Sequence, residues 1–358
     1  MDFGIFNLMT LRDAAKPRRE IIEETTALVQ QAEEIGIDVA WFAEHHFSNY
    51  SMSPSPLMMA SYMAGKTSKI DLGAAVLVLP LYHPMRVAQE VALLDIQSGG
   101  RARVGLGSGY QKHEFDRYGI HLDDRTERTL EYWEVLDQAL NTGKVAFDGT
   151  FVKVPPTELA LTPTRKIAPL YVTGNNPKIL ERAARSGAVI FMTAGYLGSQ
   201  GLFGIYDRVC DGLGKLGVDP KTVKTGIQQY IHVTDDKDDA LKAADCARYV
   251  ARLVTALRQP ETAVDGYMIR EVPIPSEPDL ETFRDNIIIG NAEYVAERMA
   301  AEIRRLNASH YNCFFQFGAL PYEMAKNSLE RFGKDVLPLL TKELGPLDKI
   351  GVPDRVAA

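Results

Sequence analysis

The sequence predicts an α/β fold, a (β/α)8 TIM barrel with insertions, and three observations favour it. Short apolar segments alternate with amphipathic helical segments from the first residues to about residue 340. Eight such apolar segments occur, each separated from the next by the dozen or more residues that parallel neighbouring strands require for their crossover. Polar residues follow several of these segments directly, at the strand ends where a parallel barrel places its substrate site.

The elements follow in order along the chain. The expected strands cover residues 3–8, 39–43, 70–79, 102–106, 170–173, 188–193, 223–233 and 310–317. The expected helices cover residues 19–35, 56–67, 83–97, 125–141, 177–186, 202–216, 237–257 and 322–340, with a further helix over 291–306 capped by Asn291. Two excursions interrupt the alternation: residues 144–166, with β-like pieces around Val145 and Phe151, and residues 259–283. We expect a single barrel domain over residues 1–345 and a tail over 346–358.

Composition restricts the class of protein. The chain of 358 residues is 46% hydrophobic and 24% charged, which is ordinary for a globular protein. A net charge of −7 with mixed signs gives no basic stripe for nucleic acid or a membrane surface. The three cysteines are odd in number and widely spaced, so they fit neither a disulfide framework nor a zinc site. With no signal peptide visible, the expected location is cytoplasmic.

The second expected strand ends in a carboxylate and two imidazoles, Glu44, His45 and His46. Buried polar groups there need hydrogen-bond partners or a chemical role, and backbone capping explains each of them singly about as well as catalysis does. Histidine titrates near neutrality, so one placed beside a cofactor could exchange protons with it. A metal site competes, but the remaining histidines form no cluster with carboxylates, and we expect no metal. Those histidines are His83, His113, His121, His232 and His310.

The third and fourth strands end in small residues. Small residues in the segment 73–80 would let a planar ring lie against the backbone, although plain barrel packing is the explanation that the sequence alone prefers. Gly105, Gly107 and Gly109 superficially suggest a dinucleotide fingerprint. Their spacing is too even for that motif, so a Rossmann fold is rejected.

The fifth strand passes through a Gly-Asn turn into a helix that Pro177 opens. Backbone amides at such a helix start, helped by the helix dipole, can bind a phosphate group at Gly174, Asn175 and Asn176. An ordinary turn with an asparagine cap explains the same residues.

Together these motifs resemble the luciferase-like flavin monooxygenases, and the likeness runs from Met1 to about Leu340. The segments that carry it are EHHF at 44–47, VLP at 78–80 with HP at 83–84, LD at 94–95 with GR at 100–101, and SLERF at 328–332 with VLP at 336–338. Their order and spacing, rather than any one segment, carry the resemblance.

The resemblance implies a barrel that binds FMN. It implies a nonprolyl cis peptide at Ala75-Val76 against the flavin ring. It also implies flavin contacts from Gly107, Ser108 and Gln111, and a phosphate site at Gly174, Asn175 and Asn176. Luciferase has a reactive cysteine where this chain has Gly107 and an arginine where it has Ser108. These departures argue against light emission and against a long-chain aldehyde substrate.

The resemblance also implies a mechanism. A separate flavin reductase would supply reduced FMN, and dioxygen would form a flavin hydroperoxide that oxidises a small organic substrate. His45 would manage the peroxide proton, with Glu44 orienting it or contacting the ring. The segment after Tyr196 or the 259–283 excursion would exclude water.

Several alternatives stay open at this point. A deazaflavin-dependent hydride-transferring enzyme on the same barrel and a noncatalytic flavin-binding subunit are the rivals. Aromatic and methionine side chains after the strands suggest an apolar substrate cavity, although core packing explains them at least as well. They are Tyr50, Met52, Phe191 and Met192. The resemblance favours a homodimer built on helices from the first half of the chain.

Overall fold

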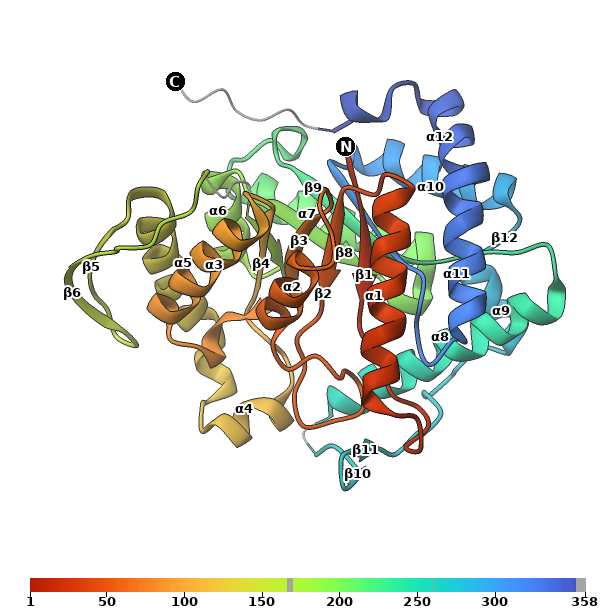
Figure 1. The fold of residues 1–358 in the computed structure, drawn as a ribbon, viewed down its shortest axis with the longest axis horizontal. Coiled ribbons are helices and arrows are strands. Elements are labelled where there is room, and N and C mark those ends of the chain that lie inside the picture. Colours follow the sequence, from red (N-terminus) through yellow and green to blue (C-terminus); the bar gives the residue numbers. More distant parts are fainter. Residues whose placement is uncertain (166–169, 260, 352–358) are drawn as a thin grey trace.

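The computed structural model describes residues 1–165, 170–259 and 261–351. Within them, eight parallel strands close into a barrel surrounded by helices, as the sequence predicts (Figure 1). In barrel order these are β1 (Asp2–Asn7), β2 (Val39–Phe42), β3 (Asp71–Val78), β4 (Ala102–Gly107), β7 (Tyr171–Thr173), β8 (Val189–Thr193), β9 (Thr225–Val233) and β13 (His310–Phe314). Pairing of β8 with β9 closes the ring.

The helices cover the outside of the barrel near their expected positions. They are α1 (Arg18–Glu34), α2 (Pro56–Ala64), α3 (Pro84–Ser98), α5 (Arg125–Thr142), α6 (Pro177–Ser186), α7 (Gly198–Lys215), α8 (Lys237–Leu257) and α10 (Ala292–Leu306). The expected helix over 322–340 is α11 (Tyr322–Arg331), a π-helical turn at Phe332–Val336 and α12 (Leu337–Leu344). The Asn291 side chain caps α10 by accepting from the Tyr294 backbone N–H at 2.9 Å, as predicted.

The sequence analysis did not predict the short elements. The seven residues of α4 (Lys112–Tyr118) are mostly charged, and β12 (Ile288–Gly290) has only three residues. The first excursion is a hairpin of β5 (Lys144–Asp148) and β6 (Lys153–Glu158), with Phe151 between the strands. The second contains β10 (Val264–Asp265), β11 (Met268–Ile269) and the start of α9 (Leu280–Asn286). Residues 166 and 260 of these excursions, and 352–358 of the expected tail, lie outside the described residues.

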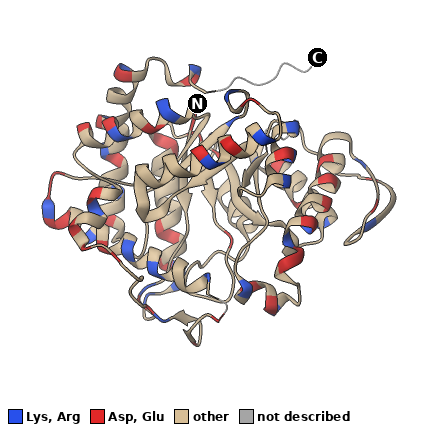
Figure 2. Cartoon of the chain, turned by 180° about the vertical axis from the view of Figure 1, so that it is seen from behind, with Lys and Arg blue, Asp and Glu red and all other residues tan. Residues whose placement is uncertain are grey.

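Aromatic side chains fill the middle of the barrel. The Trp41 ring lies 4.7 Å from Tyr171 and 5.6 Å from His310 between centroids, and Phe191 packs against all three. A Cβ at Gly73 would come within 2.6 Å of the Trp41 ring, so a glycine on β3 makes room for the indole. We call these four aromatic residues the barrel floor. Charged residues lie mainly on the outer helices and loops (Figure 2).

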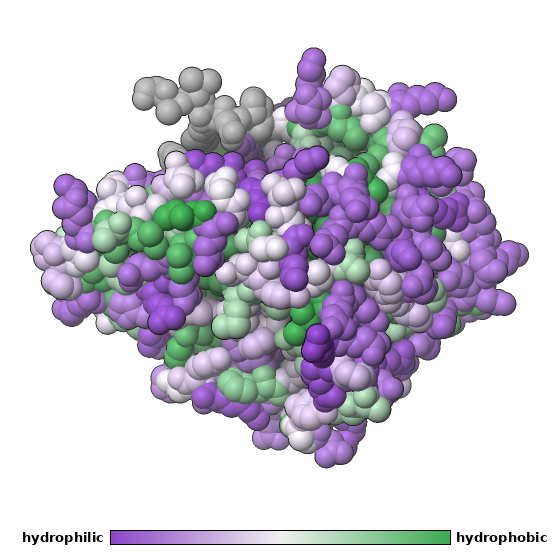
Figure 3. Space-filling view, in the orientation of Figure 1, coloured by the Kyte–Doolittle hydropathy of each residue, from purple (hydrophilic) through white to green (hydrophobic). Residues whose placement is uncertain are grey.

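One apolar face lies on the outside of the molecule. Met58 and Tyr62 of α2 and Leu93 and Ile96 of α3 are exposed, and the two helices contact each other. Figure 3 shows hydrophobic atoms over this region. No helix in the described part of the chain combines the length and apolar character needed to cross a bilayer.

Candidate functional site

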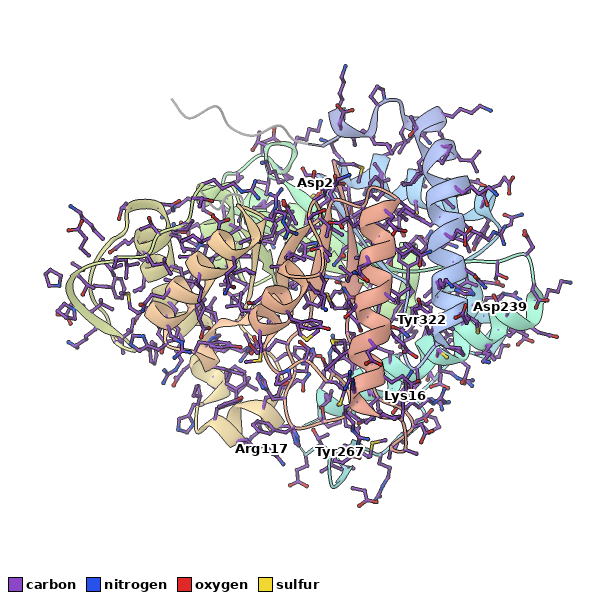
Figure 4. All side chains as sticks on the ribbon, in the orientation of Figure 1. Asp2, Lys16, Arg117, Asp239, Tyr267 and Tyr322 are labelled. Carbon is purple, nitrogen blue, oxygen red and sulfur yellow. The ribbon has the colours of Figure 1, made fainter. Side chains whose placement is uncertain are left out.

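The loops that follow the barrel strands gather at one end of the molecule, which we call the mouth. Figure 4 places Lys16, Arg117 and Tyr267 there, whereas Asp2, at the start of β1, lies toward the opposite end. These residues come from the loop after β1, from α4 and from the loop between β10 and β11. Parallel strands all end at the same edge, so polar side chains far apart in sequence meet at the mouth.

Glu44 and His46 form a buried pair. Glu44 Oε1 lies 2.8 Å from His46 Nε2, and the Tyr118 hydroxyl lies 3.0 Å from the other ring nitrogen of His46. Side chains alternate along an extended segment, so Glu44 points to the side of His46 and away from His45. Of the two roles expected for Glu44, orienting His45 is therefore not what the hydrogen bonds show, and contact with the flavin ring stays a prediction.

The carboxylate of Glu44 also joins two strand ends. Its Oε2 accepts a hydrogen bond from the Val78 backbone N–H at 3.0 Å, and Tyr82 donates its hydroxyl to the same side chain. Burial raises the pKa of Glu44, while the hydrogen bonds from His46, Val78 and Tyr82 act in the opposite direction. Glu44 thus ties β2 to the end of β3.

His45 points to a different set of partners, which α4 supplies. His45 Nδ1 lies 3.2 Å from Glu114 Oε1 and 2.9 Å from Gln111 Nε2. A protonated Nδ1 donates to the carboxylate, whereas an unprotonated Nδ1 accepts from the amide, so either state has a partner. Glu114 is itself held by the His46 backbone N–H at 2.7 Å. The Tyr50 ring covers His45 at 4.5 Å between centroids.

Glu114 was missed by the sequence analysis. It is 1% exposed, yet it stands in the charged run of α4, which has the composition of a solvated surface. One feature of the sequence could have indicated a helix over this run. Gly119 directly follows it, and a glycine in the left-handed conformation often ends a helix.

The expected cis peptide is present between Ala75 and Val76. Both residues are half-buried, whereas the other residues of β3, except the first one, Asp71, are buried. This stretch therefore has an accessible side. Beside it, a Cβ at Gly107 would come within 2.4 Å of Val76 Cγ2 and 3.2 Å of Thr173 Oγ1. A side chain at position 107 would collide with Val76, so glycine is what lets the Val76 side chain pack directly against β4.

The predicted phosphate-binding turn lies at the end of the next strand. Gly174 has φ of 123°, a conformation that favours glycine, and Asn176 caps α6 by accepting from the Lys178 backbone N–H at 3.0 Å. Gly174, Asn175 and Asn176 are all exposed, and Pro177 opens α6 as expected. The turn is therefore both an asparagine-capped helix start and an accessible one.

The structure thus brings most of the predicted site residues onto consecutive strand ends. Gln111 is fully buried, and its Oε1 has no hydrogen-bond partner among the described residues. Ser108 is half-buried between Gly107 and the α4 loop. In the chain segments that the structure describes, no group of three or more His, Cys, Asp or Glu side chains could hold a metal ion.

Not every predicted residue lies at the mouth. Of the expected cavity residues, Tyr50 lies against His45, whereas Phe191 belongs to the barrel floor and Met192 is 3% exposed. Met52 packs against a small separate cluster that contains Met9.

A cavity of about 400 Å³ does lie near the mouth, between the loops after β1 and β13. Its charged lining is already paired, since Lys16 contacts Glu24 at 2.6 Å. Gln316 also donates to Glu24 at 2.9 Å. None of the predicted site residues lines this cavity.

Comparison with known proteins identifies the family. The sequence profile of luciferase-like monooxygenases matches residues 1–310, and the chain belongs to this family. It is 32% identical to the uncharacterized protein y4vJ of Sinorhizobium fredii, over 96% of this chain and 99% of that protein. It is 26% identical to the oxygenase component of the flavin-dependent trigonelline monooxygenase of Acinetobacter baylyi, over 96% of both chains. These matches support a flavin-dependent monooxygenase.

Solved structures show the same fold. The monooxygenase RslO1 of Streptomyces bottropensis aligns with a TM-score of 0.80 at 21% identity, over 94% of this chain and 99% of that one. The oxygenating constituent of 3,6-diketocamphane monooxygenase from Pseudomonas putida, in complex with FMN, aligns at 0.74 and 19% identity, over 95% and 98%. The coenzyme F420-dependent tetrahydromethanopterin reductase of Methanopyrus kandleri aligns at 0.68 and 19% identity, over 94% and 98%.

Proposed function

We propose that this protein is the oxygenase component of a two-component monooxygenase. It would take reduced FMN from a separate flavin reductase and use dioxygen to oxidise a small organic substrate. The single observation that carries the proposal is the position of His45 and the partners of its Nδ1. This nitrogen faces a carboxylate that can accept from it and an amide that can donate to it. His45 follows β2, and the accessible Ala75-Val76 stretch belongs to the neighbouring strand β3. Family membership supports the reaction class.

The residues present fit a flavin. Ala75 and Val76 are half-buried where their strand neighbours are buried, and glycine at position 107 lets Val76 pack against β4 beside them. The unpartnered Oε1 of Gln111 could accept from the N–H groups of a flavin ring. The exposed turn of Gly174, Asn175 and Asn176 would hold the phosphate. When bound, the reduced flavin supplies the electrons that activate dioxygen.

The protein's own groups have distinct roles in this proposal. His45 gives or takes a proton at its Nε2, while Nδ1 keeps its own proton and donates it to Glu114. In the neutral tautomer that carries its proton on Nε2, Nδ1 accepts from Gln111 instead. Glu44 holds His46 and the Val78 backbone, which fixes the end of β3 beside the flavin site. Tyr50 covers one side of the His45 ring and limits the access of water.

The test is product formation by the purified chain with a flavin reductase, NADH and FMN over a panel of ketones, aldehydes, terpenes and N-heterocycles. We expect a product that carries one oxygen atom from ¹⁸O-labelled dioxygen. His45→Ala should lower turnover by about 10²- to 10⁴-fold with FMN affinity retained, because general acid–base catalysis contributes that much. His121→Ala, which removes an exposed histidine elsewhere, should leave turnover unchanged.

A second candidate is a deazaflavin-dependent hydride transferase, favoured by the structural likeness to an F420-dependent reductase. Under that reading the protein would turn over only with the deazaflavin and would consume no dioxygen. If the wild type bound flavin but formed no product with any cofactor, a noncatalytic flavin-binding subunit would be the better conclusion.

We also propose a homodimer through the apolar face of α2 and α3. Met58, Tyr62, Leu93 and Ile96 are exposed there, and contiguous apolar surface favours association. Light scattering should give twice the mass of 39.7 kDa, and Leu93→Glu with Ile96→Glu should give the monomer. A wild-type monomer at micromolar concentration would contradict this.

A further inference from the structure

We propose that Asn49 is a positioning residue that couples docking of the β10–β11 hairpin over the mouth to the placement of His45. The hairpin comprises residues 264–269 and belongs to the second excursion. The inference rests on the proposed function only for the role of His45 in turnover. The mechanical coupling stands on contacts within the chain.

Asn49 joins three parts of the chain that are distant in sequence. It is fully buried, and its Oδ1 accepts from the Ile269 backbone N–H at 2.8 Å while its own backbone N–H donates to Tyr267 at 2.9 Å. Its amide nitrogen donates to the Leu11 carbonyl and the Tyr249 hydroxyl, both at 2.7 Å. Both ends of its side chain are therefore occupied, and two of its bonds hold the hairpin.

The loop that carries Asn49 also carries His45. The loop is closed on itself, since the His45 backbone N–H donates to the Ser53 carbonyl at 3.2 Å. Tyr50, next to Asn49, lies against the His45 ring at 4.5 Å and donates its hydroxyl to Tyr110. A shift of Asn49 thus moves the side chain that covers His45.

Burial of this loop depends on the hairpin. Apart from Phe47, residues 44–53 are buried or half-buried, although loops usually lie at the surface. The Tyr267 carbonyl of the hairpin accepts from the Asn49 backbone N–H and so satisfies one buried donor of the loop, while the Asn49 side chain satisfies the Ile269 N–H of the hairpin in return. Without the docked hairpin, the Asn49 backbone N–H and Oδ1 would lose their partners, while its bonds to Leu11 and Tyr249 would keep the loop attached to the barrel.

The other ties of the hairpin are of a different kind. Arg252 pairs with Glu271 at 2.7 Å and with Glu277 at 2.5 Å, and Arg12 lies 3.6 Å from Glu271. These pairs hold the chain just after the hairpin and are partly exposed, so solvent weakens them. The hairpin itself is held by its two bonds to Asn49, by Arg18 at the Tyr267 side chain and by the burial of Ile269 in the core.

The far end of the same excursion is held separately. Phe283 of α9 is fully buried and stacks on Tyr196 at 5.3 Å between ring centroids. Loss of the Asn49 bonds would therefore loosen the hairpin and leave α9 in place. A small element that opens on a fixed base is suited to admit substrate and then exclude water.

The test compares Asn49→Ala with Tyr249→Phe, which removes one partner of Asn49 but neither hairpin bond. Limited proteolysis should cleave Asn49→Ala within residues 261–275 about tenfold faster than the wild type, because local opening exposes the backbone. The ¹⁵N signals of the His45 imidazole should shift in Asn49→Ala. In Tyr249→Phe, cleavage and signals should match the wild type.

A second variant tests the same coupling if Asn49→Ala folds poorly. Replacing residues 264–269 by Gly-Ser-Gly leaves Asn49 in place and should reproduce the His45 signals of Asn49→Ala. In both variants turnover should fall about tenfold with flavin affinity unchanged, the result expected when a positioning group is lost. The coupling is overturned if the hairpin-deleted chain keeps wild-type His45 signals. Proteolysis and imidazole signals need no substrate, so a failed monooxygenase assay alone leaves this result intact.

Discussion

The barrel floor and the mouth both bury histidine, but in opposite surroundings. At the floor, His310 is fully buried among Trp41, Tyr171 and Phe191, and Trp41 Nε1 donates to its Nε2 at 3.0 Å. Burial lowers the pKa of His310 to about 3, and the nearby positive charge of Arg103 acts in the same direction. At the mouth, His45 and His46 each face a carboxylate.

The contrast shows what each environment allows. Burial without a counter-charge keeps His310 neutral, and the His310 side chain acts as a buried polar core residue. Carboxylates at the mouth give the imidazoles a partner when they carry an added proton. The same residue type therefore serves packing at the floor, whereas at the mouth it is paired with carboxylates, as the proposed proton transfer by His45 requires.

The largest expected effect concerns the floor. Trp41→Ala removes a fully buried indole and leaves His310 without its donor. The free energy of unfolding should fall by about 3–5 kcal/mol, the usual cost of removing a large aromatic side chain from a core. Denaturation in guanidinium chloride measures it. A loss below about 1 kcal/mol would mean that the floor does not carry the stability of the barrel.

The second effect is a pH dependence that arises at the floor. An unfolded histidine titrates near pH ~6.5. Below that pH the unfolded chain therefore binds a proton at this position, whereas His310 in the folded chain stays unprotonated until the pH approaches 3. This histidine therefore contributes stability above pH ~6.5, and that contribution is lost as the pH falls toward 3. Between pH 6.5 and 4.5, His310→Gln should lose about 2–3 kcal/mol less stability than the wild type.

Urea denaturation at both pH values gives this difference. His121→Gln, which alters an exposed histidine, serves as the control and should follow the wild type. Equal losses for wild type and His310→Gln would show that His310 is not the group that titrates.

The smallest effect belongs to the mouth and should appear in activity rather than stability. Glu114→Gln keeps an oxygen that can accept from the His46 backbone but removes the charge beside His45. We expect kcat to fall about tenfold, as is typical when a group that orients a catalytic residue is changed. Tyr118→Phe, which removes a partner of His46 only, should change kcat less. Equal losses in the two variants would contradict the separate role of Glu114.

Much of the fold could be predicted from local patterns. All eight barrel strands were expected, because an apolar run and the helix after it are recognisable within about twenty residues. The Asn291 cap and Pro177 at the start of α6 followed from the same local chemistry. The short α4 and β12 were missed because seven and three residues are too few for a period to show.

The catalytic and flavin-binding roles of the expected site residues stay predictions, but the structure does decide their pairings. Gln111 lies beside His45, whereas Glu44 pairs with His46 and the Val78 backbone. The partner of His45 is Glu114, which stands 69 positions away. The assignment of Glu44 to His45 failed because sequence neighbours in an extended segment point to opposite sides.

The sequence by itself determined the alternation of strands and helices and the polar residues at the strand ends, since both depend on neighbours along the chain. The tertiary structure decided which carboxylate serves which histidine, and it placed the hairpin on Asn49 across 220 positions. Such contacts arise only when β8 and β9 close the barrel and bring distant loops to one mouth. No periodic pattern encodes them, because each depends on where the whole chain has folded.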